Sequence, residues 1–202
     1  MGSASVPTRP SESDRAPRLA MNAVLPPDGA ETTLAAWRAR DAEVRERTTA
    51  GGLIRPEKFV GKLGLDFLRA MMSGNGPIPP IQKTLDFILA EVDPGRVQFQ
   101  GKPQLAHYNP LGSIHGGWIA TLLDSAMACA VHSLLPAGQT YATLELKVNY
   151  VRALTHHVPL VRAIGEIIHS GRRIATAQGR LVGPDGTLYA HATTTCIVLD
   201  AR

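Results

Sequence analysis

The sequence predicts an α+β domain in which a curved antiparallel sheet wraps around one long central helix. Three observations support this class. A nearly all-apolar helical pattern reaches from a turn at residue 109 to about residue 135, two strand patterns precede it, and four follow it. A helix that is apolar on most of its surface must be covered on nearly all sides, and a sheet curved around it meets that requirement.

Residues ahead of this domain are expected to form two parts. Residues 1–30, rich in Pro, Ser, Ala and Arg, are expected to be a disordered tail. Residues 31–79 are expected to be a helical extension, with one helix from Thr32 to Thr48, capped by Thr32 or Thr33, and another from Leu63 to Met72. The main domain then occupies residues 80–202.

Within that domain, strands are recognised by apolar runs and by alternation between turn residues. Leu144, Leu146, Val148 and Tyr150 alternate with polar residues, a clear period of two. The other expected strands are residues 82–92, 96–101, 159–169, 172–182 and 188–199, with turns at residues 93–95, 170–171 and 183–186. Residues 136–138, Pro-Ala-Gly, are expected to stop the helix.

Composition limits the class of function. The chain has 202 residues, 44% of them hydrophobic, which is enough for one core. Its net charge of +4 favours solubility first and anionic ligands second, and no basic stripe with interleaved aromatics predicts nucleic-acid binding. The two cysteines lie in apolar segments and are expected to be buried thiols. No membrane span or signal peptide is recognised, so we expect a cytoplasmic protein.

The turn that opens the helix, together with one acid inside it, suggests chemistry on a carbonyl group. Gly116 and Gly117 stand at the helix start, where backbone N–H groups lack helical partners and face the positive end of the helix dipole. Asp124 lies among apolar neighbours, where a carboxylate needs a partner or a function. The alternatives are a simple glycine-rich turn and an acid on a solvated helix flank.

These residues together resemble a known family, the hotdog thioesterases, and within it the phenylacetic-acid-degradation type of acyl-CoA thioesterase. The resemblance covers roughly residues 80–199 and is carried by Asn109, His115-Gly116-Gly117, Asp124, Thr143 and Asn149-Tyr150-Val151-Arg152. It implies a hotdog fold and hydrolysis of an acyl-CoA to a free acid and coenzyme A. It also implies that the N–H of Gly116, beside Gly117, polarises the thioester carbonyl, and that Asp124 acts as general base or nucleophile.

Three neighbouring side chains have two interpretations each. Asn109 could orient the substrate carbonyl or water, or only start an Asn-Pro turn. His115 could donate to the carbonyl, or bond to nearby backbone. Thr143 could place the water beside the acid, or be an ordinary strand residue.

Recognition of coenzyme A would fall to basic residues and to the segment before the domain. Arg152, Arg172 and Arg173 could bind its phosphates. The second helix and the loop at residues 73–80 could shape the acyl pocket. The remaining histidines show no metal-ligand spacing, so we expect no metal and no cofactor other than the coenzyme A of the substrate.

Helix geometry predicts that the site is shared between subunits. Gly116 and Asp124 are eight residues apart, about 12 Å along a helix, too far to act on one carbonyl within one chain. A second copy could bring its Asp124 to this Gly116, so we expect a homodimer or tetramer with sites between subunits. Two other functions stay open: a hotdog hydratase or dehydratase, which would want a His/Asp pair, and a non-catalytic acyl-CoA-binding protein. The acyl group is not determined.

Overall fold

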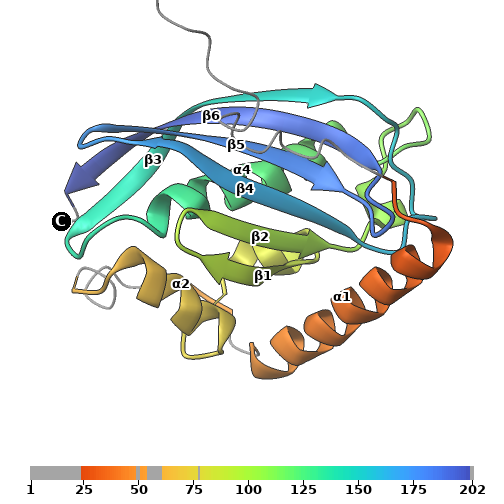
Figure 1. Ribbon diagram of the computed structural model, residues 1–202, viewed down its shortest axis with the longest axis horizontal. Coiled ribbons are helices and arrows are strands. Elements are labelled where there is room, and N and C mark those ends of the chain that lie inside the picture. The colour runs from red at the N-terminus through yellow and green to blue at the C-terminus, as the bar shows by residue number, and fades with distance from the viewer. Residues whose placement is uncertain (1–23, 49–50, 54–60, 77, 201–202) are drawn as a thin grey trace, which may run out of the picture.

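The computed structural model describes residues 24–48, 51–53, 61–76 and 78–200 and confirms the α+β class (Figure 1). Its elements, in chain order, are α1 (Pro27–Arg47), α2 (Gly64–Met72), α3 (Pro80–Thr84), β1 (Phe87–Asp93), β2 (Arg96–Gly101), the short 3-10 helix η3 (Leu105–His107), α4 (Gly116–His132), β3 (Gln139–Tyr150), β4 (Val161–Ser170), β5 (Ile174–Val182) and β6 (Leu188–Asp200). No helix of the described residues is both long and apolar enough to cross a bilayer.

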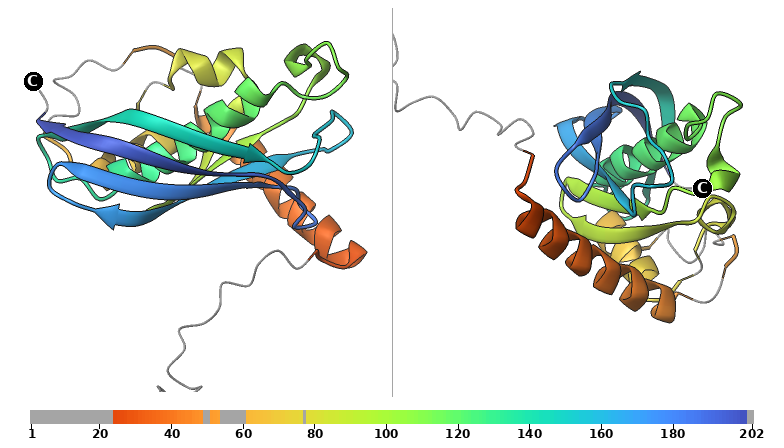
Figure 2. Two further views of the ribbon diagram at one scale, coloured as in Figure 1. Left: turned by 90° about the horizontal axis from the view of Figure 1, so that it is seen from above. Right: turned by 90° about the vertical axis from the view of Figure 1, so that its right-hand side faces the viewer.

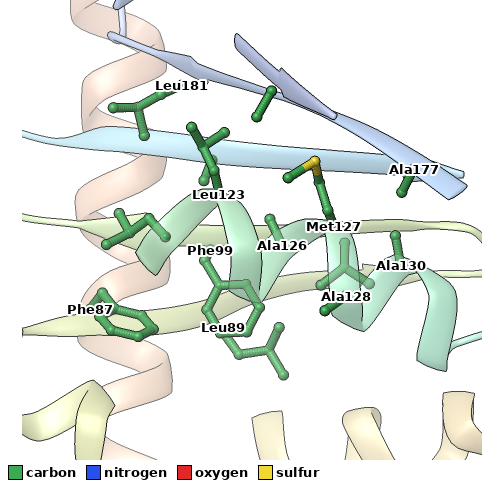
Figure 3. Close-up of a cluster of buried hydrophobic side chains, with 14 of the residues drawn as sticks. Phe87, Leu89, Phe99, Leu123, Ala126, Met127, Ala128, Ala130, Ala177 and Leu181 are labelled. Atoms are coloured by element: carbon green, nitrogen blue, oxygen red, sulfur yellow. The ribbon is translucent and has the colours of Figure 1, made fainter. Parts of the chain in front are cut away.

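The six strands form one antiparallel sheet in the order β1-β2-β4-β5-β6-β3, and the sheet curves around α4 (Figure 1). Helix α4 packs against every strand. Leu123 and Met127 of α4 lie toward β5, where Leu181 and Ala177 meet them, as Figure 3 shows. The expected hotdog layout, with an apolar helix enclosed by the sheet, is therefore confirmed.

Close contact between α4 and the sheet depends on a glycine in β4. A Cβ on Gly165 would lie 2.3 Å from the backbone of Ala126, so any side chain there would push the helix away. The small residues on both sides let the helix backbone lie directly on the strand. This contact fixes the depth of α4 in the sheet, and with it the position of the residues on its other flank.

A β-bulge in β3 changes the strand alternation that the sequence suggests. Thr143 pairs with Cys196 and Glu145 pairs with Thr195, so Leu144 is the extra residue. Tyr141 and Thr143 precede the bulge on the face that looks toward α4, whereas the even-numbered residues take that face after it. Leu144 is accordingly 59% exposed instead of continuing the apolar line. Bulges of this kind often re-aim a side chain next to a functional site.

Helix α1 covers the outer side of β1 and β2, as the right-hand view of Figure 2 shows. Only Trp37 and Val44 of this helix are buried, so most of its surface faces solvent. Beneath it, the guanidinium of Arg162 stacks 4.7 Å from the Trp37 ring, donates to Gln100 over 2.9 Å and pairs with Glu91. The N-terminal extension therefore shields a polar patch of the outer sheet face.

Several expected boundaries differ from the structure. Helix α1 begins at Pro27, because Pro26 and Pro27 supply a preset helical start, so residues 27–30 are not a disordered tail. Residues 1–23 of that expected tail lie outside the described residues. Thr32 and Thr33 do not cap α1; their hydroxyls donate to carbonyls one turn earlier inside it. The division at residues 79 and 80 remains a prediction.

The expected strand at residues 82–92 is wrong in its first half. Pro79 and Pro80 start the short helix α3 there, and β1 begins only at Phe87, after Asp86 takes a positive φ of 50°. Helix α4 also ends at His132, before the Pro-Ala-Gly segment. The expected strand 96–101 matches β2 in full, and the later strands differ from expectation by a few residues at their ends.

Candidate active site

Asp124 lies on the flank of α4 that faces β3. Its carboxylate oxygen Oδ1 accepts a hydrogen bond of 3.1 Å from the Thr143 hydroxyl. Partial burial of the carboxyl raises the pKa of Asp124 above its ordinary value, and the Thr143 hydrogen bond opposes that rise. A carboxylate with a raised pKa is a stronger base than an exposed aspartate.

The amino end of α4 presents one backbone N–H without a partner. His115 is the N-cap, and its Nδ1 accepts from the N–H of Gly117 over 2.8 Å. Within the described part of the chain, no group accepts a hydrogen bond from the N–H of Gly116. Gly116 is thus the donor left free at the positive end of the helix dipole, whereas Gly117 is occupied by the cap.

Tyr150, which the sequence analysis named as part of the strand end that carries the resemblance but gave no role, explains why position 116 is glycine. A Cβ there would lie 2.9 Å from Cζ of Tyr150, and the Tyr150 hydroxyl donates to the carbonyl of Gly116 over 2.9 Å. The missing side chain therefore makes room for the Tyr150 ring. No signal in the sequence indicated this contact beyond the position of Tyr150 at the end of a strand.

The side chain of Asn109 makes its hydrogen bonds within its own loop. Its Oδ1 accepts from the backbone N–H groups of Leu111 and Ser113, over 2.9 Å and 3.3 Å, and its Nδ2 donates to Ser113 Oγ. This is the geometry of a turn-forming asparagine. Of the two interpretations of Asn109, the structure supports the turn former, and a role toward substrate remains a prediction.

The cap also limits what His115 can do. Because Nδ1 accepts a hydrogen bond, the hydrogen of the neutral imidazole resides on Nε2. The ring thus holds the turn, as one interpretation had it, and Nε2 is the atom left to donate to a carbonyl. His115 is exposed, so a ligand can reach it.

A cavity of about 490 Å³ opens beside Asp124. The cavity runs between α4, the start of β3, and the α2 and α3 segments. The second helix and the end of the loop at residues 73–80, which were expected to shape a pocket, therefore contribute to its lining. Its lining is mostly apolar: Phe67, Leu68, Met71, Pro79, Ile81, Phe87, Phe99, Ala128 and Ala142. Its polar members are Gln82, Asp124, Ser125, Cys129, His132, Thr140, Tyr141 and Thr143.

Among the described residues of that lining, Asp124 is the only carboxyl group, and none is a lysine or an arginine. Burial raises the pKa of the Cys129 thiol to about 12 and the pKa of Tyr141 well above its usual range, so neither group ionises near neutral pH. Burial also lowers the pKa of His132 to about 4. The cavity therefore suits an uncharged, mainly apolar group that ends near a carboxylate.

The three candidate arginines lie at opposite ends of β3. Arg152 follows the strand's carboxyl end, whereas Arg172 and Arg173 line a second cavity, of about 760 Å³, at its amino end together with Thr140. The twelve residues of β3 span about 40 Å, so one phosphate cannot reach both places in one chain. Thr140 lines both cavities, which brings Arg172 and Arg173 next to the apolar one.

The structure does not bring Gly116 and Asp124 together within one chain. Both are on α4, at its first residue and eight residues on, about 12 Å along the axis. Strand β3, which flanks both residues, is an edge of the sheet, and its residues Leu144 and Tyr150 are exposed. The described residues hold no group of three His, Cys, Asp or Glu side chains that could bind a metal ion.

A curved antiparallel sheet around a central helix defines a hotdog protein, and in this one an acid faces a mostly apolar cavity. Residues 111–190 match the family model of the Thioesterase superfamily. That segment contains the Gly-Gly helix start, Asp124 and Thr143, so the resemblance predicted from these residues is confirmed.

Several named proteins are similar to this chain. A Halobacterium salinarum protein named "Putative esterase" is 31% identical over 101 residues, which are 48% of this chain and 65% of that protein. The crystal structure of a phenylacetic acid degradation-related protein from Ralstonia eutropha JMP134 has 28% identity and a TM-score of 0.58, covering 67% of this chain and 99% of that one. A thioesterase family protein from Silicibacter pomeroyi has 27% identity and a TM-score of 0.56, covering 60% and 90%.

Proposed function

We propose that this protein is an acyl-CoA thioesterase that works as a homodimer or a larger homo-oligomer. The observation that carries the proposal is Asp124, half-buried, bonded to Thr143 and facing an apolar cavity. Similarity to the Thioesterase superfamily supports hydrolysis of a thioester in general. The acyl-CoA substrate, the roles of the residues and the oligomer are our inference from the site.

In the proposed reaction the thioester carbonyl oxygen is bound by the N–H of Gly116. This N–H stabilises the negative charge that develops on the oxygen, an effect of roughly 3–4 kcal/mol in measured acyl-transfer enzymes. Asp124 takes a proton from water as the water oxygen bonds to the carbonyl carbon. The C–S bond then breaks, and the proton passes to the departing coenzyme A thiolate.

A second route uses the same atoms. The Asp124 carboxylate attacks the carbonyl carbon itself and expels the thiolate, and water then hydrolyses the resulting anhydride. Partial burial of the carboxyl supports either role, because it makes Asp124 a better base and a better nucleophile. Oxygen-18 water in a single turnover separates the routes, since only the anhydride route places label in the protein.

The two groups act on one carbonyl only if they come from two copies. Gly116 and Asp124 of one chain are about 12 Å apart along α4. Pairing of the free edges of two β3 strands would place the two α4 helices antiparallel, with the Asp124 of each opposite the Gly116 of the other. The exposed Leu144 and Tyr150 of β3 would then be covered.

The apolar cavity beside Asp124 is the proposed acyl pocket. Its aromatic and aliphatic lining suits an uncharged acyl group. Arg172 and Arg173, in the adjoining second cavity, are the arginines better placed for coenzyme A phosphates reached from that pocket. Arg152 lies beyond the carboxyl end of β3, so it could bind a coenzyme A phosphate only at a site at that end.

Release of free thiol from a panel of acyl-CoAs tests the proposal. We expect turnover by the wild-type protein and loss of most of it in Asp124→Asn, which keeps the shape of the side chain. Asp93→Asn, at an exposed position of the β1–β2 turn, is the matched control and should keep full activity. Binding without thiol release would instead indicate a non-catalytic acyl-CoA-binding protein, and hydration of an enoyl-CoA would indicate the hydratase class.

A further inference from the structure

His132, the last residue of α4, is buried at the far end of the proposed acyl pocket. Its side chain lines that cavity, and the residue is only 7% exposed. The rings of Phe67 and Tyr141 lie 5.4 Å from its own, centre to centre. Nδ1 of His132 has no hydrogen-bond partner among the described residues. A buried polar atom without a partner is costly, and in native proteins it calls for an explanation.

The surroundings keep this histidine uncharged. Burial lowers the pKa of His132 to about 4, so the imidazole is neutral at neutral pH. A neutral imidazole has one donor nitrogen and one acceptor nitrogen. An anionic group at this end of the cavity would find no positive charge on the ring, and an uncharged hydrogen-bonding group is the better match.

Helix α2 closes the end of the cavity where His132 lies. The N–H of Gly64, the first residue of α2, donates to the carbonyl of Leu135 over 3.0 Å. A Cβ on Gly64 would lie 1.8 Å from the carbonyl oxygen of His132, so the two helices meet backbone to backbone. Nδ1 is out of reach of solvent, whereas Nε2 is not one of the buried unpartnered atoms and makes no hydrogen bond to the described residues, so Nε2 is the nitrogen that His132 can offer to the cavity.

The cavity extends from the acid to the histidine. Asp124 and His132 both line it and are eight residues apart on α4, about 12 Å along the axis. An acyl group with its carbonyl at Asp124 points its other end at His132. Ala128 and Cys129 line the stretch between them, so the middle of the acyl group meets uncharged side chains.

We propose that His132 determines substrate specificity by hydrogen-bonding an uncharged hydroxyl at the distal end of the acyl group. The inference deepens the proposed thioesterase function and rests on it. A hydroxyl both donates and accepts, so it pairs with either tautomer of the neutral ring. An acyl group that ends in a methyl would leave Nε2 of His132 facing it without a hydrogen bond, and a site with an unpaired polar group discriminates against such a substrate.

Matched substrates test this proposal. Hexanoyl-, octanoyl- and decanoyl-CoA are compared with their ω-hydroxy counterparts by thiol release. At the best chain length we expect a kcat/KM about tenfold higher for the hydroxylated member, the size of one buried hydrogen bond. His132→Leu should reverse this preference, and His132→Gln, which keeps a donor and an acceptor, should retain it in part.

His107→Leu is the matched control. His107 is also a buried histidine with an unpartnered Nδ1, but it stacks on Trp118 and does not line the cavity. Its substitution should leave the hydroxyl preference unchanged. Melting curves for all variants show whether each one folds.

The outcomes distinguish a failure of the role proposed for His132 from a failure of the proposed thioesterase function. Thiol release with equal rates for both members of every pair in the wild type, or the same preference in wild type and His132→Leu, overturns the role of His132 while leaving a thioesterase. If no acyl-CoA releases thiol, the proposed function fails, and calorimetric titration with the matching free fatty acids and ω-hydroxy acids then decides whether His132 selects hydroxylated ligands. If His132→Leu does not fold, the wild-type preference and His132→Gln decide.

Discussion

The Thr143 hydroxyl donates a 3.1 Å hydrogen bond to the carboxylate of Asp124, joining the central helix to the edge strand. This relationship depends on the bulge at Leu144, which places Thr143 on the inner face of β3, opposite the buried Cys196. The bond favours the ionised carboxylate, whereas burial of Asp124 favours the protonated one. Thr143 is therefore a positioning residue that also adjusts the acidity of the proposed base.

Thr143→Val removes the hydroxyl and keeps the shape of the side chain. We expect kcat/KM to fall roughly tenfold, because a hydrogen bond to a charged group contributes about 1.5–3 kcal/mol. We also expect the acid limb of the pH–rate profile to move to higher pH, since the bond that lowers the pKa of Asp124 is gone. Thr193→Val, at an exposed position of β6, is the control. A lower rate with an unmoved acid limb would contradict the effect on Asp124.

Asp124→Asn should make the protein more stable at neutral pH. The pKa of Asp124 is raised in the folded state, so the folded protein binds more protons than the unfolded chain between the unfolded and folded pKa values. Stability therefore falls as pH rises through that window and stays lower above it. Asparagine carries no such cost.

Melting temperatures measured between pH 3 and pH 8 check this expectation. The variant should melt at a higher temperature than the wild type at pH 8. The difference should shrink as the pH falls and nearly vanish toward pH 3, where the carboxyl of Asp124 is mostly protonated in the unfolded chain as well as in the folded protein. A variant that melts lower than the wild type at every pH would mean that the carboxylate stabilises the fold, contrary to the burial of Asp124.

The pattern of apolar residues was sufficient to predict the fold, because α4 is enclosed and its sequence is apolar around most of its surface. The free N–H of Gly116 followed from the position of a helix start. The bulge at Leu144 could not be predicted, since the residues around it alternate as in a regular strand and only pairing with β6 shows the shift.

The contact of Tyr150 with Gly116 likewise depends on tertiary structure. The sequence did contain an indication that His132 is functional, because, like Asp124, it is a polar residue in an apolar helix. The sequence analysis gave it no role. The start of β1 was misplaced because the local effect of Pro79 and Pro80 outweighs the apolar run that follows.

A double-mutant cycle tests the packing of Tyr150 on Gly116. Gly116→Ala should destabilise the protein by roughly 1–2 kcal/mol, because its Cβ would lie 2.9 Å from the tyrosine ring. In a Tyr150→Ala background the same change should cost almost nothing, since the ring is absent. Denaturant unfolding gives the four free energies. Gly29→Ala in the first turn of α1, where the nearest contact is an ordinary 3.5 Å, is the control and should not destabilise. Additive costs would show that the ring is not what excludes a side chain.

Mixed oligomers test whether one site uses two copies. Gly116→Pro removes the N–H donor, and His115, with φ −60° and ψ 134°, already has a backbone conformation that tolerates a following proline. Proline also brings a Cβ against the Tyr150 ring, so Gly116→Ala, which adds the same Cβ but keeps the N–H, is the control for that clash. Asp124→Asn removes the acid. Each variant alone should be nearly inactive. In a heterodimer, one of the two sites combines an intact Gly116 with an intact Asp124, so a random mixture of dimers should recover about a quarter of the wild-type rate.

The two variants carry different affinity tags, so tandem purification isolates the heterodimer, and unmixed samples treated alike give the baseline. Verified heterodimers without recovered activity would place both groups in a single chain and contradict the shared site.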